Sequence, residues 1–416
     1  MQCKRTLNKN NIKNLYNMKQ IISNRIQMLS ESQTIAMSQR SAELKAEGKD
    51  IINLSVGQPD FSTPDHIKQA GIQAINDNYT SYTPVPGYKD LREAIANKLK
   101  NENNLDYSFD QIVVSAGAKH SLANALLSIV NKGDEVIVPA PYWVSYVEQV
   151  KLAEGENVIV PTSIDNNFKI TPQQLKEAIS DKTKALMLCS PSNPTGSIYT
   201  KEELKEIAEI VAASKNDIYI ISDEIYEYIN FEGKHESIAQ FDIVKDKTII
   251  INGVSKGYAM TGWRIGYMAA PKEVAAACAK LQGQVTSGAC SIAQRASLTA
   301  ITSDNSFTRE MNEAFKRRRD LVLEGLDQIK GLKKYTPKGA FYLFPNVTYY
   351  FGKSNGSVTI ENDQDLCFYL LDEAYVALVP GTAFGSPENI RISYAASDEE
   401  LKEALSRIKI ALDKLR

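Results

Sequence analysis

The sequence predicts an α/β protein in which a mixed, mostly parallel sheet is covered by helices and joined to a smaller α+β domain. Short apolar runs alternate with helical patterns between residues 112 and 251, and this alternation is typical of parallel, helix-covered sheets. The chain has 416 residues, too many for one simple core. We therefore expect two unequal domains with a ligand cleft between them.

The first 21 residues are predicted to be a disordered extension. Residues 1–20 are rich in asparagine and carry no acid to balance their basic residues Lys4, Arg5, Lys9, Lys13 and Lys19, a composition typical of disorder. Met18 is an alternative start. An organellar transit peptide is the other interpretation, against which stand the absence of serine and the weak helical amphipathicity.

Two separated stretches, residues 22–64 and 306–416, are expected to build the smaller domain, and residues 65–305 the large one. In the first stretch a helical pattern at 22–49 precedes a strand at 51–55. In the second, strands are expected at 339–344 and 377–381, and residues 349–365 are predicted to be a surface insertion. The first helix of this stretch carries three consecutive arginines, expected on a solvated face: Arg317, Arg318 and Arg319.

Apolar runs in the large domain predict six buried strands. They cover residues 112–115, 135–138, 158–160, 185–188, 218–222 and 248–251. One predicted helix begins at Pro64, and the others cover residues 91–101, 119–130, 142–152 and 172–179. Because ligands bind beyond the carboxyl ends of parallel strands, residues that follow these strands are site candidates.

Composition excludes several classes of function. A formal net charge of -2 gives no general attraction to nucleic acid, and no apolar run approaches the length that spans a bilayer. The five cysteines are scattered without a CxxC pair, and the three histidines lie far apart in sequence, so we expect a reducing, cytoplasmic location and no metal site.

A lysine just after the strand at 248–251 is the first candidate for chemistry. Lys256 becomes nucleophilic toward an aldehyde if burial and neighbouring cations remove its proton. Arg264 offers a planar fork that matches a phosphate, and glycines at 257, 262 and 266 allow close backbone approach. The segment predicts a phosphorylated aldehyde held by the lysine; the alternative is an ordinary strand-loop-strand segment with a solvated lysine.

The turn after the strand at 112–115 is a candidate phosphate site. Gly117 and Ala118 lead directly into a helix, whose first N–H groups can bind an anion. Lys119 in the first turn opposes the helix dipole by about 0.3–1 kcal/mol, and a nearby anion would remove that cost. The alternative for Lys119 is a side chain directed to water. Tyr82, in a rigid proline-containing loop, has a phenol to offer a phosphate.

Residues after other strands are candidates that also have plainer explanations. Asp223 and Tyr226 lie three residues apart after the strand at 218–222, where a carboxylate can keep a pyridine nitrogen protonated; a helix N-cap is the alternative for Asp223. Trp143 could stack on a cofactor ring or pack in the core. Asn193 offers an amide and Gly57 a backbone N–H, although both could belong to simple turns.

Together these motifs resemble the fold-type I pyridoxal phosphate enzymes, specifically the class I/II aminotransferases, over nearly all of residues 22–416. Within that family the chain is similar to the bacterial beta branch of aspartate aminotransferases at residues 141–146, 222–226 and 255–266. The resemblance implies a fold-type I transferase with pyridoxal 5'-phosphate as cofactor. It also implies amino acid and 2-oxo acid substrates and a homodimer with shared active sites.

The resemblance gives each candidate a role toward the cofactor ring. Lys256 would be the Schiff-base lysine and the proton shuttle. Asp223 would pair with the pyridinium nitrogen, Tyr226 and Asn193 would bond the ring hydroxyl oxygen, and Trp143 would stack on the ring.

The cofactor phosphate and the substrate would be held by further groups. The resemblance implies that Arg264, Ser255 and the backbone around Ala118 and Lys119 hold the phosphate, with Tyr82 reaching in from a second subunit.

In the same family an arginine at a strand end, here Arg391, binds the substrate α-carboxylate, and Gly57 and Asn193 assist. Lys119, with a hydroxyl near Thr34, would bind the distal carboxylate, since residues 281–291 lack the arginine that another branch uses. Aspartate or glutamate, with 2-oxoglutarate or oxaloacetate in a ping-pong reaction, is the predicted chemistry.

Three other classes of function compete with this interpretation. The first is another reaction on the same cofactor, either a prephenate or aromatic aminotransferase of the same branch or a lyase. The second is a pyridoxal phosphate-sensing regulator, which would need a DNA-binding module that the residues before Ile22 are too few to form. The third is a nicotinamide enzyme, whose glycine fingerprint the first strand-helix turn lacks.

Overall fold

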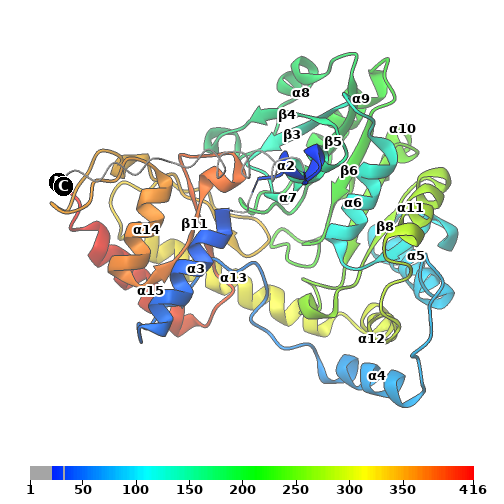
Figure 1. The fold of residues 1–416 in the computed structure, drawn as a ribbon, viewed down its shortest axis with the longest axis horizontal. Coiled ribbons are helices and arrows are strands. Elements are labelled where there is room, and N and C mark those ends of the chain that lie inside the picture. Colours follow the sequence, from blue (N-terminus) through cyan, green and yellow to red (C-terminus); the bar gives the residue numbers. More distant parts are fainter. Residues whose placement is uncertain (1–20, 31–32) are drawn as a thin grey trace, which may run out of the picture.

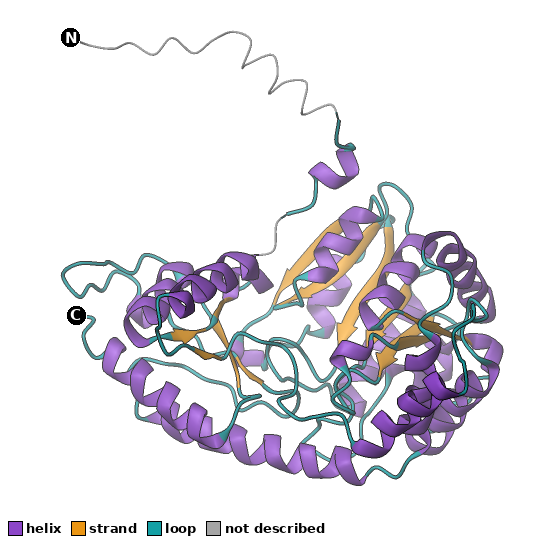
Figure 2. Cartoon of the chain, turned by 60° about the horizontal axis from the view of Figure 1, so that its bottom comes forward, coloured by secondary structure: helices purple, strands orange, loops and turns teal. Residues whose placement is uncertain are grey.

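The computed structural model describes residues 21–30 and 33–416, without the side chains of residues 33–36 and 38, and its elements follow the predicted order (Figures 1 and 2). The predicted disorder of residues 1–21 and the alternative start at Met18 therefore fall almost wholly outside the described residues.

A seven-stranded sheet, in the order β2-β8-β7-β6-β5-β3-β4, forms the centre of the larger part of the molecule. Neighbours from β4 to β7 pair in parallel, whereas β8 runs antiparallel to both β7 and β2. The mixed, mostly parallel sheet is thus confirmed. Its strands are β2 (Ile112–Ser115), β3 (Glu135–Ala140), β4 (Glu156–Pro161), β5 (Thr183–Cys189), β6 (Tyr219–Asp223), β7 (Thr248–Gly253) and β8 (Gly266–Ala269).

Helices cover both faces of this sheet, which explains why its central strands are continuous apolar runs. Residues of α6, α7 and α11 form one hydrophobic core with the sheet, residues of α5 and α12 a second, and residues of α8 and α9 a third. The helices in this part of the chain are α4 (Asp65–Asn76), α5 (Lys89–Asn103), α6 (Ala118–Ile129), α7 (Ser145–Leu152), α8 (Pro172–Ala178), α9 (Lys201–Ala213), α10 (Asp242–Lys245), α11 (Lys272–Val285) and α12 (Ser291–Thr302).

A further hydrophobic core joins residues from both ends of the described chain. Met37 and Leu44 share it with Phe315 and Leu401, and β1 pairs in parallel with β10, Ile52 opposite Val376. The two stretches predicted for the smaller domain therefore lie together, and the exact domain limits stay a prediction. The elements here are α3 (Gln33–Ala46), β1 (Ile52–Asn53), α13 (Ser306–Asp327), β9 (Tyr342–Leu343), α14 (Asp363–Ala374), β10 (Val376–Ala377), β11 (Val379–Pro380), β12 (Ile390–Ser393) and α15 (Asp398–Leu412).

The long helix α13 runs from beside α12 toward α15 (yellow in Figure 1). The expectation that its three arginines form a solvated face is wrong for two of them, since Arg318 and Arg319 are only 8% and 9% exposed. Each is paired with acceptors: Arg318 binds the carboxylate of Asp60, whose side chain is 28% exposed, and Arg319 donates to the Pro337 carbonyl at 3.0 Å. The helix therefore joins the loop that contains Asp60 to the rest of this core.

Two surface segments complete the fold. Residues after the 3-10 turn η5 (Thr348–Tyr350) include a bridge between Ser354 and Thr359, and the Ser354 backbone pairs with Arg416. The short helix α2 (Asn24–Gln27) contacts α7, and Ser30 N–H donates to the Glu148 carboxylate at 2.9 Å. Among the helices that the structure describes, none is long and apolar enough to cross a membrane.

Candidate active site

A cavity of about 970 Å³ opens where the carboxyl ends of β5, β6 and β7 face strands β9 and β12. It brings together most of the predicted site residues, which are Gly57, Ala118, Lys119, Trp143, Asn193, Asp223, Tyr226, Ser255, Lys256, Arg264 and Arg391. Tyr82 does not line it and is 97% exposed. Thr34 lies in α3, and its side chain is outside the described part of the structure.

Lys256 follows β7 in the turn that leads toward β8, and its amine lies inside the cavity. Nζ donates to the Gly57 carbonyl at 2.5 Å. Burial, and after it repulsion by Arg391 and Arg264, lowers the pKa of this amine from 10.5 to about 8. A substantial fraction of the amine is therefore neutral near physiological pH, as a nucleophile or proton acceptor requires.

Asp223 ends β6 and is buried at the floor of the cavity. Burial raises the pKa of its carboxyl to about 6, against the opposing effect of two hydrogen bonds. Tyr146 Oη donates to Oδ2 at 2.7 Å, and the Ile225 N–H donates to Oδ1 at 3.3 Å. These donors favour the ionised carboxylate, and a cationic ring nitrogen beside it would favour that form further.

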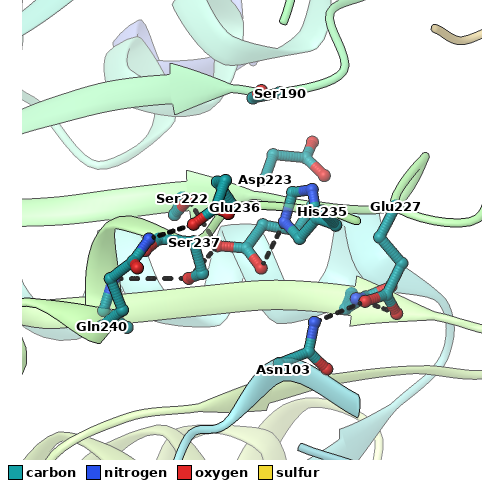
Figure 3. Close-up of polar contacts among 12 residues, drawn as sticks. Asn103, Ser190, Ser222, Asp223, Glu227, His235, Glu236, Ser237 and Gln240 are labelled. Carbon is teal, nitrogen blue, oxygen red and sulfur yellow. Dashed lines mark hydrogen bonds and ion pairs between the residues drawn. The ribbon is translucent and has the colours of Figure 1, made fainter. Parts of the chain in front are cut away.

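A buried polar network that the sequence analysis missed lies directly behind Asp223. The Glu224 carboxylate accepts from Ser222 Oγ at 2.8 Å and Ser237 Oγ at 2.6 Å, and it pairs with His235 Nε2 at 2.9 Å. Figure 3 shows His235 and Ser237 beside Ser222 and Asp223 at the end of β6. The network fixes the backbone that carries Asp223. The only sequence signal was a glutamate directly after Asp223.

A second missed group ties α5 to the same loop. Lys98 Nζ lies 2.5 Å from Glu227 Oε1, and both residues are buried. Asn103 and Asn252 donate to the same carboxylate at 3.0 and 2.8 Å, the first of these contacts being drawn in Figure 3. Because each charge is paired and hydrogen-bonded, the pair holds the segment after β6 in one position.

The start of α6 forms a cradle for an anion. Gly117 has a φ of 88°, and a Cβ there would lie 2.4 Å from Arg264 Nη2; a Cβ on Gly266 would lie 2.1 Å from Ala118 N. Arg264 therefore lies against the helix N-terminus only because both positions are glycine. A guanidinium beside the positive end of a helix dipole is unfavourable unless an anion lies between them, so the cradle fits a phosphate.

Arg391, in the middle of β12 and not at its predicted end, is buried in the cavity wall. Nη1 donates to Asn193 Oδ1 at 3.0 Å and Nη2 to the Ser55 carbonyl at 2.7 Å. The guanidinium lies 4.5 Å from the Tyr342 ring centroid. Its Nε is buried and has no acceptor among the described residues. A buried guanidinium in the wall of a cavity is suited to bind a carboxylate ligand.

Aromatic side chains complete the walls. Tyr226 Oη and Tyr342 Oη are 2.9 Å apart, and the Lys119 amine lies 4.8 Å from the Trp143 ring centroid. Partial removal from water, and then repulsion by Arg264, lowers the pKa of Lys119. Tyr342 and Tyr146 were missed by the sequence analysis, because no local pattern connects either of them with the strand ends.

The residues of the cavity match the aldehyde, ring nitrogen, phosphate and ring faces of pyridoxal phosphate. A deprotonatable lysine, a buried carboxylate at the right strand end, a phosphate cradle and flanking aromatic rings line one cavity. A parallel sheet whose strand ends carry this set defines a fold-type I enzyme that depends on this cofactor.

Comparison with known proteins identifies the family. The model of "Aminotransferase class I and II" matches residues 49–408, and the chain belongs to this family, whose members depend on pyridoxal phosphate. The predicted family, fold class and cofactor are thus confirmed.

Three similar proteins are aspartate aminotransferases by name. A bifunctional aspartate aminotransferase and glutamate/aspartate-prephenate aminotransferase of Petunia hybrida is 47% identical over 396 residues, 94% of this chain and 82% of the relative. An aspartate aminotransferase of Bacillus subtilis is 46% identical over 395 residues, 94% of this chain and 99% of the relative. The crystal structure of an aspartate aminotransferase from Rhizobium meliloti superimposes with a TM-score of 0.92 at 42% identity, covering 95% of this chain and 99% of that one.

Proposed function

We propose that the protein is an aspartate aminotransferase that moves an amino group between aspartate or glutamate and a 2-oxo acid. The observation that carries this proposal is that two cationic side chains, Arg391 and Lys119, line the same cavity as Lys256. A dicarboxylic substrate offers one carboxylate to each. The names of the relatives at 46% and 47% identity support the same substrate class.

In the proposed mechanism Lys256 holds the cofactor and then works as a base. Pyridoxal phosphate, when bound, supplies a ring that accepts the electron pair released from the substrate Cα. Lys256 Nζ would take the proton from the substrate Cα and return it to the C4′ carbon of the cofactor, a transfer that its pKa of about 8 permits. The ionised Asp223 keeps the ring nitrogen protonated, and Tyr226 and Asn193 bond the ring oxygen.

Binding and orientation fall to the remaining residues. Arg264, Ser255 and the first N–H groups of α6 at Ala118 and Lys119 hold the phosphate. Trp143 covers the ring.

Arg391, a buried cation in the cavity wall, binds the α-carboxylate. It fixes the substrate beside the Lys256 amine, and Gly57 assists through its backbone.

Replacement of Lys119 tests substrate choice. Lys119→Ala should raise the KM for aspartate roughly tenfold or more, as expected for loss of one charge-assisted contact, while the KM for alanine changes little. Lys151→Ala is the matched control, because Lys151 lines the same cavity but its amine is paired with the Glu148 carboxylate at 2.9 Å. Equal effects on aspartate and alanine would remove Lys119 from substrate recognition.

A prephenate aminotransferase is the second candidate, favoured by the bifunctional name of the Petunia hybrida relative. The half-reaction decides between the two: loaded protein is mixed separately with aspartate, glutamate, arogenate, phenylalanine and alanine, and the cofactor absorbance is followed. Conversion by aspartate and glutamate supports the first proposal. Preference for arogenate or phenylalanine supports the second, and no conversion would favour a lyase.

We also infer a homodimer whose active sites are shared. Tyr82 is 97% exposed and lies outside the lining of its own cavity, and the apolar side chains of Ile72, Ile75 and Val285 are 49%, 54% and 63% exposed. A second copy of the chain would cover such a surface, and the Tyr82 phenol would enter the active-site cavity of that copy. Mixing inactive Tyr82→Ala and Lys256→Ala chains should restore part of the activity, because one site of the mixed dimer is intact. An active monomer in sedimentation would contradict this inference.

Two further proposals concern the domain limits and the location of the protein in the cell. The domain division at 64/65 and 305/306 is supported by the core that α3 shares with α13 and α15, and limited proteolysis near these positions would test it. A cytoplasmic location is supported by the free thiols of Cys189, Cys278, Cys290 and Cys367, which a reducing compartment preserves.

A further inference from the structure

One short segment contacts both the reactive lysine and the carboxylate-binding arginine. Residues 55–60 form neither helix nor strand. The Ser55 carbonyl accepts from Arg391 Nη2 at 2.7 Å, and the Gly57 carbonyl accepts from Lys256 Nζ at 2.5 Å. A Cβ on Gly57 would lie 2.9 Å from Tyr342 Oη, so the segment fits closely against the cavity wall. Its position helps to determine where both cationic groups lie.

The segment is anchored at its far end by an ion pair to helix α13. Arg318 Nη1 and Nη2 donate to the two carboxylate oxygens of Asp60 at 2.7 and 2.9 Å. The guanidinium carbon lies 5.2 Å from the centroid of the Phe61 ring, which packs edge-on against Phe307 and Phe315. A bidentate, stacked arginine fixes both the distance and the orientation of its partner.

Arg318 is also held from the other side. Its Nε lies 3.4 Å from Asp398 Oδ1, in the first turn of α15. Arg317 reaches the same carboxylate at 3.0 and 3.1 Å, but its side chain is 61% exposed against 10% for Arg318. Arg318 therefore joins the segment that contains Gly57 to two helices, whereas Arg317 joins only the helices to each other.

We propose that Arg318 and Asp60 form a positioning pair that sets the affinity of the site for the substrate α-carboxylate. Neither residue lines the cavity, so the pair acts through residues 55–58 on Arg391 and Lys256. It places the Ser55 carbonyl so that it holds Nη2 of the Arg391 guanidinium and thereby sets the orientation of this group in the cavity wall. This inference rests on the proposed binding of the α-carboxylate by Arg391.

Substitutions of Arg318 and Asp60 test the positioning pair. Arg318→Lys keeps the cation but loses the fork and the stacking, and the displacement of Arg391 should raise the KM for aspartate and for alanine by the same factor, about tenfold to hundredfold. The affinity for pyridoxal phosphate, measured by absorbance titration, should stay within about twofold. Asp60→Asn is the milder second variant and should repeat the effect, and the double variant should be no worse than the more impaired single one.

The matched control is Arg317→Lys, which alters the neighbouring arginine on the same Asp398 and should leave both KM values unchanged. Binding of maleate as a substrate analogue, followed by the cofactor spectrum, gives a readout independent of turnover and should weaken by the same factor as KM. The inference is overturned if Arg318→Lys and Arg317→Lys act alike, or if Arg318→Lys lowers cofactor affinity as much as it raises KM. The Arg391→Lys variant distinguishes failure of the proposed function from failure of the positioning pair. An unchanged KM in Arg391→Lys would refute the proposed function. A raised KM in Arg391→Lys together with an unchanged KM in Arg318→Lys would refute only the positioning pair.

Discussion

Removing the hydroxyl of Tyr146 should weaken the electrostatic support of the cofactor ring. Tyr146 Oη donates to Asp223 Oδ2 at 2.7 Å in a buried setting, and hydrogen bonds to charged groups contribute about 1.5–3 kcal/mol. Since 1.36 kcal/mol corresponds to one pKa unit, loss of this donor in Tyr146→Phe should raise the pKa of Asp223 by about 1–2 units.

The sign of this change determines the effect on activity. Burial already raises the pKa of Asp223 to about 6, so loss of a donor that favours the ionised carboxylate moves the group further toward its neutral form. A neutral Asp223 no longer stabilises a protonated ring nitrogen. If the whole loss is felt in the transition state, kcat should fall roughly tenfold to hundredfold, and the acid limb of the kcat profile should move upward by about one to two pH units.

Two measurements check this prediction, the pH profile of kcat and the NMR shift of ¹⁵N in the ring of labelled cofactor. Tyr107→Phe is the matched control, because the Tyr107 hydroxyl is buried without a hydrogen-bond partner among the described residues. If Tyr146→Phe leaves kcat and the nitrogen shift as unchanged as Tyr107→Phe does, the hydrogen bond has no part in tuning the ring.

Further predictions concern Lys256, Gly117 and Lys98. The pKa of Lys256 is lowered to about 8, so the rate at which cofactor-free protein reacts with pyridoxal phosphate should rise with pH up to about that value and stay constant above it. Stopped-flow absorbance measures this rate. A midpoint near the usual lysine pKa of about 10.4 would contradict the lowered pKa. Gly117→Ala should weaken cofactor binding about tenfold or more, since its Cβ would displace Arg264, whereas Gly133→Ala, at a φ of 86° with nothing within 4 Å, should leave the titration unchanged. Lys98→Met leaves the buried Glu227 carboxylate without its cationic partner and should lower the free energy of unfolding, measured in urea, by about 3–5 kcal/mol. Lys100→Met, at an exposed position, should change it by no more than about 0.5 kcal/mol.

Much of the fold followed from local pattern. The strand predicted at 112–115 is β2 residue for residue, and the helix predicted at 91–101 lies within α5. The small-domain strands were predicted too long: residues 339–344 became Tyr342–Leu343, because only two residues there align with β12. Short irregular strands have weak periodicity and are defined by their partners.

The error at Arg318 and Arg319 has the same origin. Three consecutive arginines are usually solvated, and no local pattern shows that Asp60, 258 residues away from Arg318, lies beside the helix. Tyr342 and Tyr146 were missed for the same reason, since their partners Tyr226 and Asp223 are 116 and 77 residues distant.

The sequence by itself determined the alternation of strands and helices, and with it the strand ends where Lys256, Asp223 and the Gly117 turn are found. These features depend on apolar periodicity and on residues adjacent in the chain. Only the tertiary structure decided which side chains meet, how far burial lowers the pKa of Lys256 and raises that of Asp223, and which arginine is buried in the cavity wall. Desolvation and contact are properties of the packed chain, because they depend on every segment that closes around a group.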